Sequence, residues 1–234
     1  MGMSTQEIER IVALQAPILC LDTCSVLDTM RDPTRDMINA ADSAAALFLL
    51  TKMESKSALI GLLAPQVKFE LTDNLQKVQD EATKAIGKLK AKVSNVEAIA
   101  AAFGSIGKSD LKHLDNHIKK SRAAVDRMIK IAVTFDEPHG IHSKAFLRVN
   151  QGRTPATKGK ESSKDCVVIE SYLSIVETLR SAGWKGKGIF VSSNTKDYRG
   201  ETGNGLKGDL AAEFIAIGME YAPTMGGAKF ALGL

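Results

Sequence analysis

Pro17-Ile-Leu-Cys-Leu-Asp22-Thr23 is the stretch of this sequence that decides the fold. It is continuously apolar up to Leu21, which is typical of a strand that is buried on both faces of a parallel sheet. The apolar run ends at Asp22, so a carboxylate stands where this strand leaves the sheet. A charge at the end of a buried strand needs hydrogen-bond donors or cations around it.

Apolar runs and helical patterns alternate along the rest of the chain. Apolar runs predict further strands at residues 58–64 and 189–193, and a short apolar segment lies around residues 219–222. Helices are predicted at residues 34–53, 163–181 and 206–217. Strands that alternate with helices imply right-handed crossovers between parallel strands. We therefore predict an α/β fold in which helices cover both faces of a central, mainly parallel sheet.

A long helical hairpin is predicted between the apolar run at residues 58–64 and the helix at residues 163–181. A helical period covers residues 66 to about 103 and 109 to about 133, with Lys and Glu on the solvent face. Residues 104–107 break the period. No internal repeat or linker divides the chain, so we predict one domain of residues 1–234, with residues 66–134 as a helical elaboration within it. The apolar faces of the hairpin could support a homodimer.

The composition excludes several classes of protein. The chain has 234 residues, of which 44% are apolar and 25% are charged, as in a globular domain rather than a disordered one. Its three cysteines lack the spacing of a disulfide framework or a zinc site, so we expect a reducing, cytoplasmic environment. No apolar run is long enough to cross a bilayer, and we expect no membrane partner.

Four acids lie at the ends of predicted strands or the starts of predicted helices: Asp22, Glu70, Asp165 and Asp197. Ligands gather at the carboxyl ends of strands in such sheets. Each acid also has a structural alternative, because Asp22 can cap the next helix and Glu70 can be a solvated helix charge. Ser162-x-x-Asp165 and Asn194-x-x-Asp197 match capping boxes. If the acids converge, a metal must neutralise them, and oxygen-only ligation suits Mg²⁺ or Mn²⁺.

Three blocks of the sequence resemble PIN domains and occur in the order of that family. Ile18-Leu-Cys-Leu-Asp22-Thr-Cys-Ser-Val-Leu-Asp28 resembles the family's opening, an apolar strand that ends in an aspartate followed by Thr or Ser. Lys164-Asp165-Cys-Val-Val-Ile-Glu170-Ser-Tyr and Phe190-Val-Ser-Ser-Asn194-Thr-Lys-Asp197-Tyr resemble later motifs of a PIN-like group of bacterial proteins. With the weaker Val67-Lys-Phe-Glu70, the resemblance extends over residues 17 to about 221. The helical hairpin departs from a minimal PIN domain.

The resemblance implies a Rossmann-like, three-layer PIN fold and a metal-dependent endoribonuclease that hydrolyses RNA phosphodiester bonds. It implies that the catalytic ligands of one or two Mg²⁺ or Mn²⁺ ions are Asp22, Glu70, Asp165 and Asp197. Ser193 and Asn194 would orient the last carboxylate or the scissile phosphate, and Thr23 would hydrogen-bond a ligand or merely end the strand. The ions would polarise the phosphoryl oxygen and activate a water.

The biological setting stays open between defence, a toxin-like role and RNA turnover, and a separate inhibitor or partner protein could exist. The alternative function is a catalytically inactive PIN-like module that binds nucleic acid or protein.

A basic loop precedes Asp165. The chain carries a net charge of +4, and residues 139–164 contribute +5, which leaves −1 for the other 208 residues. We predict that this loop grips RNA phosphates, with a solvated surface loop as the alternative. Its basic residues are Lys144, Arg148, Arg153, Lys158, Lys160 and Lys164.

Two other patterns imitate functional motifs. Ala102-Phe-Gly-Ser-Ile-Gly-Lys108-Ser109 resembles a phosphate-binding P-loop, but a helix precedes it where a P-loop needs a buried strand. A turn between two helices, with Ser109 as N-cap, is the preferred interpretation, and a P-loop nucleotide hydrolase is the weaker one. His113 and His117 lie one helical turn apart without a third metal ligand, which favours a solvated face.

Overall fold

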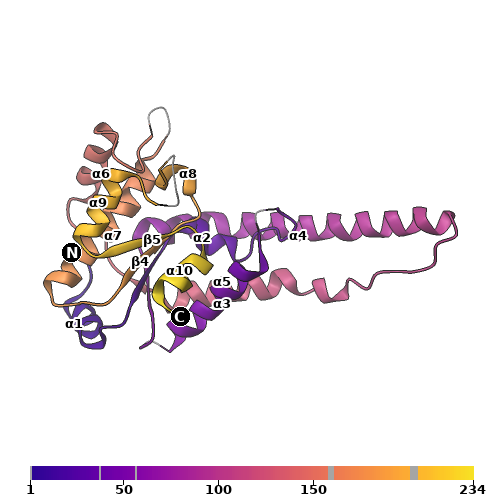
Figure 1. Cartoon of the computed structure of the whole chain (residues 1–234), viewed down its shortest axis with the longest axis horizontal. Coiled ribbons are helices and arrows are strands. Elements are labelled where there is room, and N and C mark those ends of the chain that lie inside the picture. The colour runs from indigo at the N-terminus through magenta and orange to yellow at the C-terminus, as the bar shows by residue number, and fades with distance from the viewer. Residues whose placement is uncertain (1, 37, 56, 158–160, 201–204) are drawn as a thin grey trace.

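A five-stranded, all-parallel sheet forms the centre of the protein (Figure 1). The computed structural model describes residues 2–36, 38–55, 57–157, 161–200 and 205–234. In the strand order β3-β2-β1-β4-β5, the strands are β1 (Ile18–Leu21), β2 (Ile60–Leu63), β3 (Val133–Thr134), β4 (Gly188–Val191) and β5 (Met219–Ala222). The three central strands are buried along their whole length, because their apolar side chains face helices on both sides. The predicted parallel sheet is confirmed.

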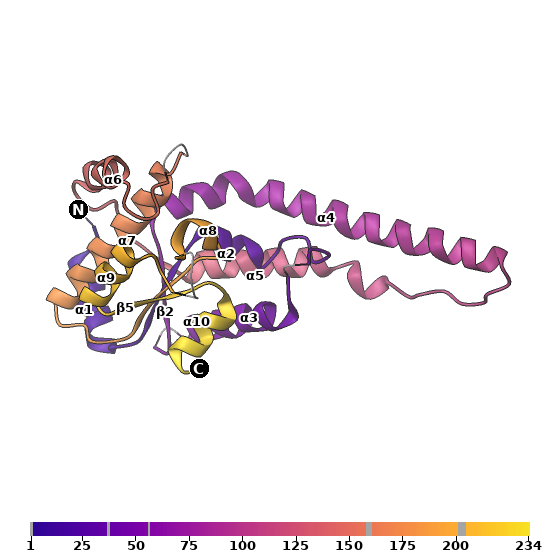
Figure 2. The same cartoon turned by 45° about the horizontal axis from the view of Figure 1, so that its top comes forward.

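Helices cover both faces of the sheet and complete three layers (Figure 2). On one face, α3 (Ala40–Glu54) packs against α5 (His117–Ile131) and α10 (Met225–Leu232). On the other face, α7 (Ser163–Ser181) packs against α1 (Thr5–Leu14) and α6 (Ile141–Asn150), and α9 (Gly208–Ala216) contacts β5. The short helices α2 (Thr23–Asp28) and α8 (Thr195–Tyr198) follow β1 and β4. The predicted three-layer α/β fold is confirmed.

Local capping explains most differences between predicted and observed element boundaries. The predicted helix at residues 34–53 begins only at Ala40, because the side chain of Asn39 accepts a hydrogen bond from the backbone N of Asp42 and caps the helix there. The strand β3 was not predicted, because two residues are too few to show a period. In contrast, α7 has the predicted bounds, and β5 coincides with the short apolar segment at residues 219–222.

The hairpin projects from the sheet in both views (Figures 1 and 2). Its first helix, α4 (Pro65–Ala102), has 38 residues and begins at a proline, which needs no amide partner in a first turn. Val78, Ala82 and Ile86 are the last buried residues of α4, so the rest of the helix stands in solvent. None of the helices in the described residues has both the length and the apolar character needed to cross a bilayer.

The second helix of the hairpin begins later than the sequence predicts. A 3₁₀ helix, η1 (Lys112–Leu114), precedes α5, which begins at His117. Ser109 caps neither helix, because Leu111 and Asn116 occupy the N-cap positions of η1 and α5. The backbone N of Ser109 donates a hydrogen bond to Glu97 Oε1 at 2.5 Å. The prediction of Ser109 as N-cap was therefore wrong. The expected connection between two helices is confirmed, and since α4 and not a strand precedes it, the P-loop context is missing.

The hydroxyl of Tyr172 connects the ends of the two central strands β1 and β2 by hydrogen bonds. Its fully buried hydroxyl donates a hydrogen bond to Leu21 O at 2.5 Å and accepts one from the backbone N of Ala64 at 3.1 Å. We expect Tyr172→Phe to lower the free energy of unfolding by about 1–3 kcal/mol, because the buried amide of Ala64 loses its partner. Urea titration measures this change, with Thr178→Val as the control that removes an exposed hydroxyl from the same helix. Equal losses in the two variants would contradict the prediction.

Candidate active site

The candidate site lies at the carboxyl edge of the sheet, between β1 and β4. Leu21 of β1 pairs with Val191 of β4, so the next residues, Asp22 and Ser192, lie side by side. From these neighbouring strands the sheet continues in opposite directions, toward β2 on one side and β5 on the other. Such a topological switch point is where open α/β sheets bind ligands.

Three neutral donors hold the carboxylate of Asp22, which is 5% exposed. Oδ2 accepts hydrogen bonds from the hydroxyl of Ser192 at 2.5 Å and from the thiol of Cys24 at 3.0 Å. Oδ1 accepts one from the backbone N of Thr23 at 2.8 Å and thereby caps α2. The capping role that the sequence suggested for Asp22 therefore uses one oxygen, and two side chains of the site hold the other.

Burial dominates the electrostatics of this carboxylate. It raises the pKa of Asp22, and the hydrogen bonds from Cys24, Ser192 and Thr23 oppose that rise. The negative charge of Glu70 raises the same pKa further. Burial, together with the charge of Asp22, raises the pKa of the Cys24 thiol to about 12, so this thiol remains protonated at neutral pH and donates its hydrogen bond. A cation beside Asp22 would offset the cost of its buried charge.

Thr23 connects Glu70 to Asp22. Its hydroxyl donates a hydrogen bond to Glu70 Oε2 at 2.7 Å, and Gln66 Nε2 donates one to Glu70 Oε1 at 2.8 Å. Glu70 is half-buried in the second turn of α4. Of the two roles predicted for Thr23, the structure therefore shows the hydrogen bond to an expected ligand.

Asp165 lies in the first turn of α7. The hydroxyl of Tyr198 is buried and has no hydrogen-bond partner among the described residues. Burial raises the pKa of Tyr198 well above its usual value, and the charges of Asp22 and Asp165 raise it further. Both carboxylates therefore act electrostatically on this one hydroxyl.

Asp197 lies in α8, one turn beyond β4. Asn194 Nδ2 donates a hydrogen bond to its Oδ2 at 2.9 Å, so Asn194 orients this carboxylate. Ser193 faces α2 instead, where its backbone N donates a hydrogen bond to Ser25 Oγ at 2.9 Å. Its side chain hydrogen-bonds the Cys24 thiol.

The four acids do not form a compact metal cluster. Within the described parts of the chain, no three His, Cys, Asp or Glu side chains gather closely enough to hold an ion. Asp22 is connected to Glu70 through Thr23, whereas Asp197 accepts a hydrogen bond from Asn194.

The donor set nevertheless fits a hard divalent cation. Asp22 is a buried carboxylate at the end of a strand, and Glu70 adds negative charge beside it. Carboxylate oxygens are the ligands that Mg²⁺ and Mn²⁺ prefer. These residues could hold such an ion at the edge of β1.

Ser192 is a site residue that the sequence analysis missed. It is fully buried, and besides donating to Asp22 its Oγ accepts a hydrogen bond from the backbone N of Asn194 at 3.2 Å. The sequence analysis selected its neighbour Ser193. The register of the parallel pair β1 and β4 would have identified Ser192, because Ser192 and Asp22 follow paired residues.

The basic residues of 139–164 separate into three groups. Lys144 and Lys164 are exposed, whereas Arg153 is half-buried and ion-paired to Glu213. Lys158 and Lys160 lie outside the described residues. Arg148 is 1% exposed, which contradicts its predicted contact with RNA phosphate. The phosphate-gripping role stays a prediction for the exposed members of this set.

Arg148 instead joins three elements through a buried network. Its Nε donates to Glu170 Oε1 at 2.7 Å, its Nη2 to Glu213 Oε2 at 2.9 Å and its Nη1 to Thr154 O at 2.7 Å. Thr154 in turn donates through its backbone N and its hydroxyl to the carboxylate of Asp209, each at 2.6 Å. Asp209 and Glu213 therefore anchor the loop between α6 and α7 to α9.

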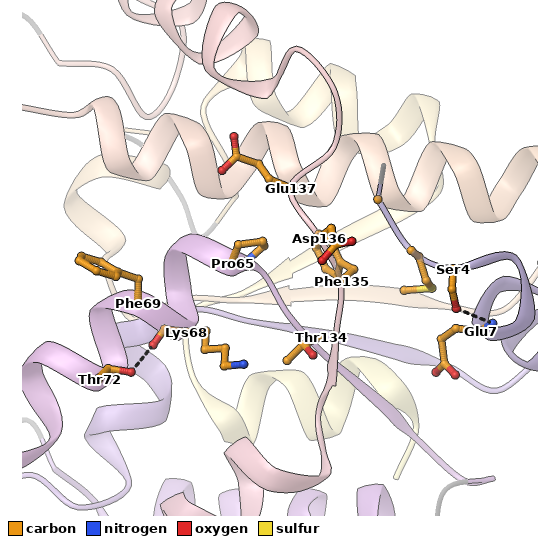
Figure 3. Close-up of a pocket in the computed structure, with 12 residues that line it drawn as sticks. Ser4, Glu7, Pro65, Lys68, Phe69, Thr72, Thr134, Phe135, Asp136 and Glu137 are labelled. Carbon is orange, nitrogen blue, oxygen red and sulfur yellow. Dashed lines mark hydrogen bonds between the residues drawn. The ribbon is translucent and has the colours of Figure 1, made fainter.

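A cavity of about 630 Å³ lies away from Asp22, next to β3 (Figure 3). Lys68 and Phe69 of α4 line it, together with Thr134 of β3 and Glu137 after β3. Lys68 is two residues from Glu70 and thus about 200° round the helix. The cavity and the Asp22 site therefore lie on different sides of α4.

Comparison with known proteins identifies the family. Neither the comparison with curated proteins nor the comparison with solved structures gave a match. A family model described as PIN domain matches residues 19–198, from within β1 to the last residue of α8. That range contains all four acids of the candidate site and the whole hairpin. Because the match covers most of the sequence, this chain belongs to the PIN domain family.

Proposed function

We propose that this protein is a Mg²⁺- or Mn²⁺-dependent endoribonuclease that hydrolyses RNA phosphodiester bonds. Membership of the PIN domain family supports hydrolase chemistry, because PIN domains are generally nucleases. The observation that carries the proposal is the buried carboxylate of Asp22 at the switch point of the sheet. Glu70, connected through Thr23, adds a further carboxylate beside it, and the resemblance to PIN domains adds Asp165 to the same set of ligands.

In this proposal the chain's own residues hold the carboxylates in place. Ser192 and Cys24 fix Oδ2 of Asp22, and Thr23 and Gln66 each hold one oxygen of Glu70. A bound divalent ion supplies positive charge for the phosphoryl oxygens and lowers the pKa of a coordinated water. Because these hydrogen-bond donors carry no charge, they do not neutralise the carboxylates, whose negative charge can still attract the ion.

Metal removal tests this function directly. In Mn²⁺, the protein is expected to open a circular RNA, which has no ends and is therefore a substrate for endonucleases only. EDTA is expected to reduce the rate to background, and excess Mn²⁺ to restore it. Asp165→Asn is expected to lower the rate by about 100-fold or more, because it removes several kcal/mol of charge interaction with the ion. The matched control is Asp126→Asn, on the exposed face of α5.

The outcomes separate the enzyme from a binding module. Cleavage that ignores EDTA, or that survives Asp165→Asn unchanged, contradicts the metal-dependent proposal. RNA binding without metal and without any cleavage would instead show a catalytically inactive nucleic-acid-binding PIN domain.

A further inference from the structure

The distal part of the hairpin carries a strong positive charge. We call residues 84–122 the arm; they contain nine Lys and Arg residues against three acids, a net charge of +6. The segment 139–164 adds +5, so the remainder of the chain has −7. The net charge of the arm is therefore larger than the +5 of the basic loop at residues 139–164, and larger than the +4 of the whole chain.

Most of this charge faces solvent. Lys90 hydrogen-bonds Asp115, and Arg122 donates hydrogen bonds to Asp126 at 2.8 Å and to Gln79 at 2.9 Å, so these two residues hold the hairpin together. The other seven basic residues have exposed side chains, and they are Lys84, Lys88, Lys92, Lys108, Lys112, Lys119 and Lys120. They are accessible to an anionic partner.

The arm shares a helix face with the candidate site. Lys88 follows Glu70 by 18 residues, which is five turns of an α-helix, so the two side chains leave α4 in the same direction. Lys84 and Lys92 lie within about 40° of that direction. Along the helix axis these three lysines lie roughly 21 to 33 Å from Glu70. A polyanion that passes Glu70 can therefore follow α4 outward along one face.

We propose that the arm binds the phosphate backbone of the RNA substrate and holds it in line with the Asp22 site. The inference rests on the proposed ribonuclease function and names the surface that its substrate occupies. The charge of the arm complements a phosphate backbone, which carries one charge about every 3.4 Å along a stacked strand. The span from Glu70 to Lys92 corresponds to on the order of ten phosphates of such a strand.

Apolar residues are exposed near the tip of the arm. Val96, Ile99 and Phe103 are 56%, 53% and 88% exposed. An exposed ring such as Phe103 can stack on an unpaired base, which favours single-stranded RNA. A second copy of this chain is a poor occupant, because two arms of charge +6 repel each other. An anionic membrane would suit lysines and apolar residues, but it would not explain why the lysines lie on the face of Glu70.

The test compares two variants that each lose three positive charges. The arm variant is Lys84→Gln/Lys88→Gln/Lys92→Gln. The control variant is Lys130→Gln/Lys185→Gln/Lys187→Gln. It changes exposed lysines that precede β3 and β4, at the edge of the sheet opposite the Asp22 site. All six lysines are exposed, and Lys and Gln have similar propensities in the helices, so both variants are expected to fold. Fluorescence anisotropy in EDTA measures binding to a single-stranded RNA of about 30 nucleotides over a range of salt concentrations. The salt dependence reports the number of phosphate contacts, because about 0.7 counterions are released per contact.

The arm variant is expected to bind at least about ten-fold more weakly at low salt, with the slope of log K against log salt reduced by about 2. The control variant is expected to keep the wild-type slope. Equal slopes in the two variants would overturn the proposal. An arm variant that keeps RNA binding but loses binding to vesicles containing phosphatidylserine would also overturn the proposal.

This result is independent of catalysis, because binding is measured without metal. Cleavage of an RNA of about four nucleotides in Mn²⁺, which is too short to reach the arm, is expected to be the same in wild type and arm variant. If neither cleaves any RNA, the proposed function fails while the binding result still decides the role of the arm.

Discussion

The Asp22→Asn variant is expected to lose about 100-fold or more of the Mn²⁺-dependent cleavage rate while remaining folded. Asparagine has the shape of aspartate, and its Oδ1 can still accept the hydrogen bond from the backbone N of Thr23 that caps α2. The substitution removes the charge that would hold a divalent ion, which is a loss of several kcal/mol. The circular-RNA assay measures this change. Asp28→Asn, at the other end of α2, is the matched control.

The same variant is expected to be more stable than wild type in EDTA at neutral pH. Burial raises the pKa of Asp22, so in the folded state this group holds its proton to a higher pH than the usual value of about 3.9. Stability is therefore lost as the pH rises from that usual value through the folded-state pKa. Below about pH 3, urea titrations are expected to give the same free energy of unfolding for wild type and Asp22→Asn. Above that pH, the variant is expected to have the larger free energy of unfolding.

Addition of Mn²⁺ is expected to reverse this order. A ligand that binds only the folded state stabilises it, so the ion should raise the thermal midpoint of wild type and not that of Asp22→Asn. Equal shifts in both proteins would contradict a role for Asp22 in binding the ion, whatever the activity assay shows.

The Arg148→Met variant is expected to lose about 3–5 kcal/mol of unfolding free energy. The guanidinium is 1% exposed and donates to Glu170, Glu213 and the carbonyl of Thr154. Methionine fills a similar volume but leaves the nearly buried carboxylate of Glu170 without its counterion. Urea titration measures the loss. Adding Glu170→Gln to the variant should recover part of it, because the uncompensated charge is then removed.

Arg153→Gln is the matched control for this network. Arg153 pairs with the same Glu213, but its side chain is 39% exposed, so the loss is expected to be about 1 kcal/mol or less. An Arg148→Met variant with wild-type stability and a reduced salt dependence of RNA binding would contradict the structural role. It would then support the phosphate contact predicted from the sequence.

Much of the fold could be predicted, because the signals involved are local. Continuous apolar runs marked β1, β2 and β4, and a helical period marked α4 and α7 within a residue or two. The start of α5 was harder to predict, because Ser109 has the chemistry of a cap but α5 begins only at His117, after Asn116. A cap residue is identified by its side chain, whereas its use depends on what else lies within reach.

The site could be predicted only in part. The sequence marked Asp22 by itself, because a charge that ends an apolar strand is conspicuous. It could not select Ser192 over Ser193, since that choice depends on the register of two strands that are 170 residues apart. It also could not show that Glu70 contacts Thr23, because that contact depends on where α4 packs against α2.

The sequence alone determined the α/β class, the PIN family and the acids at the ends of the strands, because strand and helix periods and short motifs are properties of neighbouring residues. Only the tertiary structure decided what each charge does. Arg148 and the lysines of the arm are equally basic in the sequence, yet packing buries the first among carboxylates and leaves the others in solvent. Burial and partners, which come from distant segments, set the free energy of a charge and hence its role.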